Sequence, residues 1–472
     1  MDTARAGSDV CRRRIGQFLD QDSFVELESL VTANGLSFGP ERSKAAGDGV
    51  VMGYGTIDGR MVYVAAQDPD VHGGSIGKAH ADKIARALQM ACDAQVPFIG
   101  LYDTGGARIE EGIMGLEGLG NLLASLNASA GIVPRIAAVY GPCAGGAAYA
   151  ASLSDFVLMA DKGSGIFMNG PMVVSAHENK SIAAADIGGA AVHAVKTGLA
   201  SLTAADEAGL AGIIKLLMQY IPDSGMGFIQ PVDGPDDPNR TEARLDELAA
   251  TLDDGYDMRE VLNLTVDTGS FLELSAGHAP GMVTGLALLG GRTVGILAQA
   301  ERRVNRAMAA KAVRLAGLCQ KLNLPLVTFV DAEGYTIGLA DEWAGLVQSG
   351  ADLMEAMLQL DVPRLAVIVG KAIGTAYLTF SGKSCGTDLV YAWPTAEIAV
   401  VNADTAAHII YRKDIAAAAD PITARTDFVR KYEDEIASPY VAASLGHVDE
   451  VILPSATRPR LISALDMLTT AY

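Results

Sequence analysis

One passage of this chain occurs twice. Residues 133–149 read VPRIAAVYGPCAGGAAY and residues 362–378 read VPRLAVIVGKAIGTAYL, with seven of seventeen positions identical. The similarity extends upstream, where GRMVYVAAQ (59–67) matches GRTVGILAQ (291–299) and the helical segments that follow also match. The distance between matching segments stays between 228 and 232 residues. A near-constant offset over such a span predicts a duplicated domain rather than a short repeat of the solenoid type.

Both halves have the pattern of an α/β fold. Short apolar runs such as PFIGLYD (97–103) and PLVTFVD (325–331) alternate with amphipathic helical segments. In the first of these segments Ile84, Leu88 and Ala91 share one face. Continuous apolar runs of this length are typical of parallel strands that are covered on both faces.

The two halves are joined by a segment rich in Pro, Gly and Asp, residues 222–258. Such a composition is typical of a linker, and a short helix is expected inside it at 241–252. The sequence therefore predicts an N-terminal domain over residues 1–235 and a C-terminal domain over residues 236–472.

The composition disfavours several classes of function. The chain has 472 residues and a formal net charge of −20, which argues against nucleic acid and anionic membrane surfaces as partners. Its five cysteines form no C-x-x-C pair and are typical of a reduced, intracellular protein. No apolar signal-peptide core is present, and the longest uncharged run, 136–154, contains too much Gly, Pro, Cys and Ser for a membrane span. We therefore expect a cytoplasmic protein.

The duplicated passage ends in a turn of small residues. An apolar strand leads into GPCAGGAAYAASL (141–153) in the first copy and GKAIGTAYLTF (370–380) in the second, and each stretch then reads as a helix. The first amides of a helix have no intrahelical acceptor, and small residues let a substrate oxygen approach the main chain. Backbone N–H groups alone can form an oxyanion hole in this way. Close helix–strand packing also favours small residues, but two copies at matching positions favour a functional pair.

Side-chain catalysts are harder to identify. Cys143 lies beside the glycine pair, but we expect a small buried cysteine there rather than a nucleophile. His80 and His193 are candidate general bases, although a structural or ligand-contacting histidine is the commoner situation. The chain has no G-x-S-x-G, H-E-x-x-H or P-loop motif, and no metal site is expected. This pattern predicts a site of main-chain dipoles that acts on a substrate with its own chemistry or on a cofactor.

Four blocks resemble the carboxyltransferase family of biotin-dependent enzymes. They are DTGGARIEEG (103–112), GPCAGGAAY (141–149), IGGAAVHAVKTG (187–198) and YAWPTAEIAV (391–400), and the similarity covers nearly the whole chain. The family includes the β subunits of acyl-CoA carboxylases, the α subunits of methylmalonyl-CoA and glutaconyl-CoA decarboxylases and the large subunit of transcarboxylase. The resemblance implies an α/β fold of two tandem crotonase-like (ClpP/crotonase) domains, which accounts for the duplication.

The resemblance also implies a reaction. A carboxylate moves between biotin and the α-carbon of a short acyl-CoA thioester, either methylmalonyl/propionyl-CoA or malonyl/acetyl-CoA. Backbone oxyanion holes at Gly145 and Gly146, and at Thr375 and Ala376, hold the thioester enolate and the ureido oxygen of biotin. Biotin itself takes the proton in the family's usual mechanism, which agrees with the difficulty of finding a protein base. Leu378 occupies the position that helps to set acyl size. The substrate contacts implied are Gly105, Gly106, Ala107, Arg108, Ala147, Gly374, Tyr377 and Leu378.

The same resemblance implies partners. Family members form ring-like hexamers in which the N-terminal half of one subunit, with CoA, faces the C-terminal half of another, with biotin. The chain has no A-M-K-M biotin attachment sequence, no ATP-binding module and no zinc ribbon. A separate biotin carboxyl carrier protein is therefore implied, together with either a biotin carboxylase subunit or a membrane decarboxylase subunit.

Two other functions remain open from the sequence. A crotonase-type hydratase or isomerase would need a Glu near the first turn, where the nearest acidic residue downstream is Asp155. A non-catalytic scaffold subunit is motivated by departures from the family in the second half. There the family's acidic-Pro-Gly-Phe-Leu-Pro-Gly turn is DAEGYTIG (331–338), its Gly-rich loop is replaced by ERRVNRAMA (301–309), and Thr375 stands where Gly is usual.

Overall fold

The computed structural model describes residues 9–33, 38, 45–225, 234, 236–251 and 255–469. The chain divides into two compact units, Met1–Phe228 and Ile229–Tyr472. The boundary predicted after residue 235 falls on a residue outside the described part. Among the described residues, no helix is both long enough and apolar enough to cross a bilayer.

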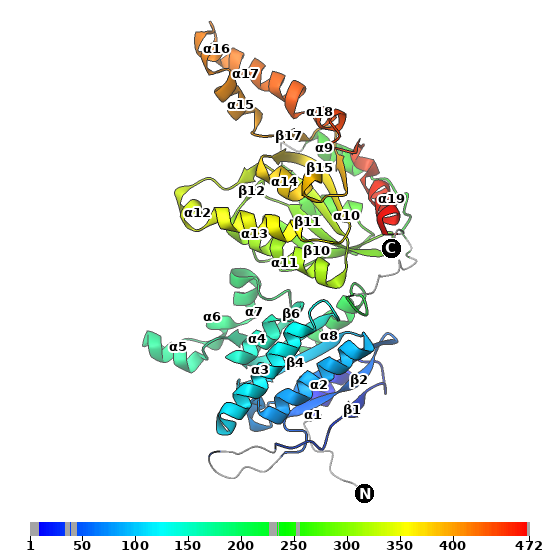
Figure 1. Cartoon of the computed structure of the whole chain (residues 1–472), viewed down its shortest axis with the longest axis vertical. Helices are drawn as coiled ribbons and strands as arrows, with labels where there is room; N and C mark the ends of the chain where they lie inside the picture. Colours follow the sequence, from blue (N-terminus) through cyan, green and yellow to red (C-terminus); the bar gives the residue numbers. More distant parts are fainter. Residues whose placement is uncertain are drawn as a thin grey trace. The chain divides into compact units, whose positions relative to one another are not determined.

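Unit 1 is built on an eight-stranded sheet (Figure 1). Its order is β1-β2-β3-β4-β5-β6-β8, and β7 pairs with β5 beyond the end of β6. The pairings β1/β2 and β2/β3 are antiparallel, while every other pairing in the sheet is parallel. The strands are β1 Val25–Leu27, β2 Val50–Ile57, β3 Arg60–Gln67, β4 Phe98–Thr104, β5 Arg135–Ala144, β6 Phe156–Ala160, β7 Gly165–Phe167 and β8 Leu202–Ala204.

Helices α2 and α3 of unit 1 pack against each other. The predicted apolar face of α2 is confirmed, because Ile84, Leu88 and Ala91 are all buried. Gly118 permits this close contact, since a Cβ there would lie 2.9 Å from the Cα of Lys78. The helices are α1 Asp9–Gly16, η1 His72–Gly74, α2 Lys78–Ala94, η2 Ile109–Glu111, α3 Ile113–Ala128, α4 Gly146–Ser152, α5 Pro171–Glu178, α6 Ala184–Gly188, α7 Ala190–Val192, η3 His193–Thr197 and α8 Glu207–Met218.

Unit 2 repeats this sheet. Its order is β9-β10-β11-β13-β15-β16-β18, with β17 pairing with β15 as β7 pairs with β5. The two pairings at the β9 end are antiparallel and the rest are parallel. The strands are β9 Leu272–Glu273, β10 Met282–Leu289, β11 Arg292–Gln299, β12 Arg303–Val304, β13 Leu326–Ala332, β14 Gly334–Tyr335, β15 Arg364–Ile373, β16 Leu389–Ala392, β17 Glu397–Ala399 and β18 Glu450–Val451. The predicted duplication is therefore visible strand by strand.

The helices of unit 2 also follow the repeat. Helix α11 has 17 residues, as α2 does, and α13 packs on it as α3 packs on α2. Helices α15, α16 and α17 project away from the sheet of this unit (Figure 1). The helices are α9 Ala243–Ala250, α10 Met258–Thr265, α11 Arg306–Leu322, α12 Leu339–Trp343, α13 Leu346–Leu358, α14 Thr375–Ser381, η5 Lys383–Cys385, α15 Ala403–Ile410, α16 Arg412–Ala417, α17 Pro421–Tyr432, η6 Glu433–Ala437, α18 Pro439–Ser444, η7 Pro454–Ala456 and α19 Thr457–Thr469. The helix expected at 241–252 is α9.

Candidate functional site

The two turns singled out from the sequence have the same backbone conformation. Gly145 precedes α4 with φ 62° and ψ −133°, and Gly374 precedes α14 with φ 62° and ψ −137°. A positive φ of this kind favours glycine, since a Cβ would strain the backbone. The N–H of Gly145 donates to the carbonyl of Phe167 at 2.9 Å, and that of Gly374 donates to Ala399, also at 2.9 Å. Each turn is therefore held against the short strand that follows it, β7 or β17.

These bonds change which amides can serve an oxyanion. The N–H of Gly145, one of the first predicted pair, already donates to Phe167, and the next two amides along the chain are those of Gly146 and Ala147. Their equivalents after Gly374 are Thr375 and Ala376, the pair predicted for the second copy. In both units these are the first two helical residues, whose amides have no acceptor within the helix.

The segment GGAR lies directly beside the first turn. A Cβ on Gly106, whose φ is +100°, would lie 2.8 Å from the carbonyl oxygen of Ala144. Ala107 forms a parallel bridge with Ile76, through Ile76 N–H to Gly106 O and Arg108 N–H to Ile76 O. In a parallel bridge of this type the amide of Ala107 itself points to the other side of the segment. The structure thus brings the Gly106 segment next to the turn at Gly145, and its contact with substrate stays a prediction.

The side chain of Arg108, a predicted substrate contact, points into unit 1 rather than to its surface. It is buried, and its Nη1 donates to Asp48 Oδ1 and Glu111 Oε1, both at 2.7 Å. Its Nη2 donates to the carbonyl of Ser75 at 2.9 Å. Burial raises the pKa of the Asp48 carboxyl, and the neighbouring Arg108 opposes this shift. The bonds of Arg108 to Asp48, Ser75 and Glu111 therefore hold the segment that contains Gly105–Ala107 in place, while Gly105 itself is exposed.

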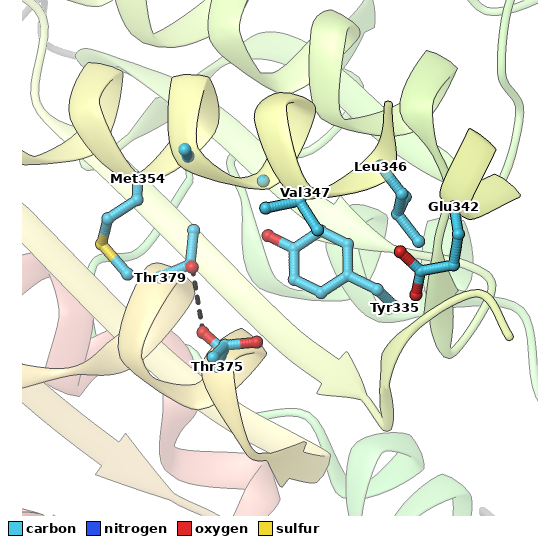
Figure 2. A pocket seen from close by; sticks show the side chains of 9 residues that line it. Tyr335, Glu342, Leu346, Val347, Met354, Thr375 and Thr379 are labelled. Carbon is cyan, nitrogen blue, oxygen red and sulfur yellow. Dashed lines mark hydrogen bonds between the residues drawn. The ribbon is translucent and has the colours of Figure 1, made fainter. Parts of the chain in front are cut away.

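Unit 2 contains a pocket beside its turn. The pocket has a volume of about 370 Å³. Figure 2 shows Val347 and Met354 on α13, Thr375 and Thr379 on α14, and Tyr335 beside them. The Thr379 hydroxyl donates to the carbonyl of Thr375 at 2.9 Å, within α14. The lining residues are Tyr335, Glu342, Leu346, Val347, Gly350, Ala351, Met354, Thr375 and Thr379.

Most of these lining residues were missed from the sequence. The repeat itself contained a signal for Tyr335, because Gly334 and Tyr335 stand 228 positions after Gly106 and Ala107. The structure bears this out: Gly334 has φ +109°, and Val304 bridges Tyr335 as Ile76 bridges Ala107. Burial raises the pKa of the Tyr335 hydroxyl.

The other predicted residues of the second turn do not line this pocket. Tyr377 is half-buried, burial raises the pKa of its hydroxyl, and Leu378 is 37% exposed. The side chain of Ala376 is fully buried, so only its backbone can serve a ligand.

The two altered segments of the second half bind each other. Arg302 Nε donates to Asp331 Oδ2 at 3.0 Å, and Arg303 pairs with Glu333 at 3.4 Å. Lys371, on β15, also pairs with Glu333, at 3.2 Å. The segments 301–309 and 331–338 are thus joined by ion pairs that involve Arg302, Arg303 and Glu333.

The three candidate side-chain catalysts are all internal. Cys143 is fully buried, and burial raises the pKa of its thiol to about 12. His80 lies 3.1 Å from the carbonyl of Asp48 through Nδ1 and 3.1 Å from Gln67 Nε2 through Nε2, and burial lowers its pKa to about 3. His193 contacts the carbonyl of Ile166 and the hydroxyl of Thr197. Both nitrogens of each ring have hydrogen-bond partners inside unit 1, as expected for structural histidines.

Comparisons with known proteins agree with this geometry. Residues 2–472 match the family model described as "Carboxyl transferase domain". The chain is 38% identical to the methylmalonyl-CoA decarboxylase subunit alpha of Veillonella parvula, over 98% of this chain and 91% of that protein. It is also 38% identical to the methylmalonyl-CoA carboxyltransferase 12S subunit of Propionibacterium freudenreichii subsp. shermanii, over 98% of this chain and 89% of that one.

A solved structure extends the likeness to the fold. The transcarboxylase 12S crystal structure, a hexamer assembly with methylmalonyl-coenzyme A and methylmalonic acid bound, matches with a TM-score of 0.93 and 37% identity. The match covers 98% of this chain and 89% of that one. The predicted α/β fold of two crotonase-like domains is confirmed.

Proposed function

This chain belongs to the carboxyl transferase domain family, and from that premise we propose how its two units share one carboxyl transfer. The enzyme is the carboxyltransferase subunit of a biotin-dependent acyl-CoA carboxylase or decarboxylase. Its acyl pair in this proposal is methylmalonyl-CoA and propionyl-CoA, supported by the names of relatives and by the ligand of the 12S structure. Malonyl-CoA and acetyl-CoA are the second pair.

The observation that carries the proposal is the twinned turn. When the α-carbon of a thioester loses or gains a carboxylate, negative charge develops on the thioester oxygen, and a pair of fixed N–H groups stabilises that charge. In unit 1 the amides of Gly146 and Ala147 would supply such donors, and Gly106 lies against the adjacent Ala144. In unit 2 the amides of Thr375 and Ala376 supply a second set. A reaction with two oxyanions, one on each substrate, needs two such turns.

The residues of unit 2 fit a biotin head group. Biotin, carried by a separate protein, supplies the atom that takes up or gives away the carboxylate. The pocket beside Thr375 is lined mainly by apolar side chains on α13, together with the polar residues Tyr335 and Glu342 and two threonines of α14. A compact ring with a polar edge suits this lining. Tyr335, Met354 and Thr375 would hold and orient the ring.

The hydratase alternative is disfavoured by where Asp155 and Glu111 lie. Asp155 pairs with Arg135 at 2.7 Å, with both side chains buried, at the start of β5, whereas the first turn follows the end of that strand. Glu111 pairs with Arg108 and also accepts from the amide of Lys78 at 2.7 Å. Neither is placed as an exposed acid or base, whereas a hydratase would need one that can reach substrate.

We further propose the partners and location of the enzyme. It acts in a homo-oligomer, taken as a hexamer by analogy with the 12S structure. A biotin carboxyl carrier protein visits it, and a biotin carboxylase subunit or a membrane decarboxylase subunit completes the complex. The location is the cytoplasm, where the five cysteines, all free in the structure, would remain reduced.

The test uses three thioesters and the free biotin derivative biocytin. The purified chain is mixed with methylmalonyl-CoA or malonyl-CoA, with and without biocytin, and loss of the carboxyl group is followed by mass. We expect loss that depends on biocytin and is faster for methylmalonyl-CoA. Hydration of crotonyl-CoA, without any carboxyl loss, would establish the hydratase instead. Binding of CoA thioesters without either reaction would support the scaffold.

A further inference from the structure

A buried aspartate stands at the same point of each unit. Asp103, next to the end of β4, is 8% exposed, and Asp331, next to the end of β13, is 3% exposed. The amide of each aspartate donates to a glutamine side chain, Asp103 to Gln67 Oε1 and Asp331 to Gln299 Oε1, both at 3.2 Å. Neither aspartate appears among the residues predicted to touch substrate.

Each aspartate faces a break in strand register. Tyr102 pairs with Val139, but Thr104 pairs with Cys143, so the single residue Asp103 stands opposite three residues of β5. In unit 2 Val330 pairs with Ile368 and Ala332 with Ala372, so Asp331 likewise stands opposite three residues of β15. The longer strand bulges outward at this point.

The aspartate carboxylate fills each bulge. A Cβ on Gly141 would lie 2.0 Å from Asp103 Oδ1, and a Cβ on Gly370 would lie 2.5 Å from Asp331 Oδ1. The glycines are therefore needed because the carboxylates occupy the space of a side chain. In unit 2 the amide of Lys371, inside the bulge, donates to Asp331 Oδ1 at 2.8 Å.

Cations hold the second oxygen of each carboxylate. Arg14 Nη1 donates to Asp103 Oδ2 at 2.9 Å, and Arg302 Nε donates to Asp331 Oδ2 at 3.0 Å. Tyr256 adds a hydroxyl donor to Asp331 Oδ2 at 3.0 Å. The arginines come from different places in the two units, one from α1 and one from the segment between β11 and β12, yet they meet the same oxygen of the equivalent aspartate.

The bulge determines how the two segments of each site meet. Immediately after it, β4 leads to Gly105 and Gly106, and β5 leads to the turn at Gly145. The contact of Gly106 with the carbonyl of Ala144 depends on the offset of the two strand ends that the bulge creates. We propose that Asp103 and Asp331 are positioning residues, which set the spacing between the two backbone segments that form each oxyanion hole.

This inference rests on the proposed function for its kinetic test. The variants are Asp103→Ala, Gly141→Ala and the double substitution, with Asp331→Ala and Gly370→Ala as the matching set in unit 2. In Gly141→Ala the new methyl group collides with the Asp103 carboxylate and displaces the segments that follow the bulge. We expect this displacement of the oxyanion hole to lower kcat by about 100-fold. In the double variant the methyl group enters vacated space, so we expect kcat to recover at least tenfold relative to Gly141→Ala, with KM for methylmalonyl-CoA unchanged.

Two controls separate positioning from stability. Asp155→Asn removes the charge of an equally buried, arginine-paired carboxylate that lies outside the bulge, and should lower the unfolding temperature while kcat stays unchanged. Asp103→Asn keeps the oxygen that faces Gly141, so it should retain more kcat than Asp103→Ala and serves if the alanine variant fails to fold.

Amide hydrogen exchange of residues 104–108 and 144–147 provides a readout independent of turnover. We expect faster exchange at both segments in Asp103→Ala than in Asp155→Asn. If the wild-type chain shows no biotin-dependent reaction, the proposed function fails. Amide hydrogen exchange alone then decides whether Asp103 positions the two segments. Additive effects of the aspartate and glycine substitutions, on kcat or on exchange, would overturn it.

Discussion

Replacing Gly145 by alanine tests the backbone turn with little steric disturbance. A Cβ at this position meets no heavy atom within 4 Å, so the substitution creates no clash. Its effect comes from the backbone, because φ is +62° and L side chains rarely adopt that region. Holding alanine there costs about 1–3 kcal/mol. The turn either keeps its shape and loses that stability, or rotates and moves the amides of Gly146 and Ala147 away from the oxyanion.

The second outcome is the one that we expect to dominate kinetics. If the peptide turns and relieves the strain, the activation free energy of carboxyl transfer rises by an amount of similar size, about 1–3 kcal/mol. This corresponds to a fall in kcat of about 5- to 150-fold. KM for methylmalonyl-CoA should change little, since the lost interaction strengthens only as charge develops. Initial rates of biocytin-dependent carboxyl loss, measured over a range of thioester concentrations, give both constants.

Gly59 provides the matched control. It also has a positive φ, +78°, and open space where a Cβ would lie, but it belongs to the turn between β2 and β3. Gly59→Ala should lose a similar amount of stability in urea unfolding and keep its kcat. If Gly145→Ala loses less stability than Gly59→Ala, its turn has rotated to relieve the strain, and an unchanged kcat would then refute the assignment of the Gly145 turn. Substitution of Gly146 is a poorer probe, because its Cβ would lie 2.5 Å from the buried Leu119.

Three further predictions concern single side chains. Cys143→Ala should keep full turnover. Iodoacetamide at pH 8 should alkylate the half-buried Cys92 and Cys385 long before Cys143, because burial raises the pKa of the Cys143 thiol to about 12. Rapid labelling of Cys143, measured by peptide mass spectrometry, would contradict its burial. His80 has a folded pKa of about 3 against an ordinary 6.5, so the stability from its neutral form is complete above pH 6.5 and is lost as pH falls towards 3. Between pH 7 and pH 5 the wild type should lose about 2 kcal/mol more unfolding free energy than His80→Gln, and equal losses would contradict this account. Leu378→Ala should raise kcat/KM for ethylmalonyl-CoA relative to methylmalonyl-CoA, because it removes bulk at an exposed position of α14; an unchanged ratio would show that Leu378 does not set acyl size.

The repeat was enough to predict the architecture. Matching apolar strands at a constant offset led to two α/β units, and the structure has two sheets of the same order. The small-residue turns before α4 and α14 were also identified, because Gly145 and Gly374 stand at matching positions of the repeat. Local patterns and the duplication were sufficient to predict those features that depend on residues close together in the sequence.

Contacts between distant residues were beyond the sequence pattern. The hydrogen bond from the Gly145 amide to Phe167, on which our proposal of Gly146 and Ala147 as donors rests, depends on how β7 pairs with β5. Arg108 stands in a glycine-rich segment typical of binding loops, yet Asp48 and Glu111 draw its side chain inward. The bulges at Asp103 and Asp331 arise from strand register, which a period-two pattern of apolar residues does not reveal.

The most direct test of the central claim is carboxyl exchange between two thioesters. Methylmalonyl-CoA with an isotopically labelled carboxylate is mixed with propionyl-CoA deuterated on its methyl group, with and without biocytin. The account predicts that the wild-type chain forms deuterated methylmalonyl-CoA carrying the labelled carboxylate, and does so only when biocytin is present. Exchange that proceeds equally without biocytin, or hydration of crotonyl-CoA with no exchange, would contradict it.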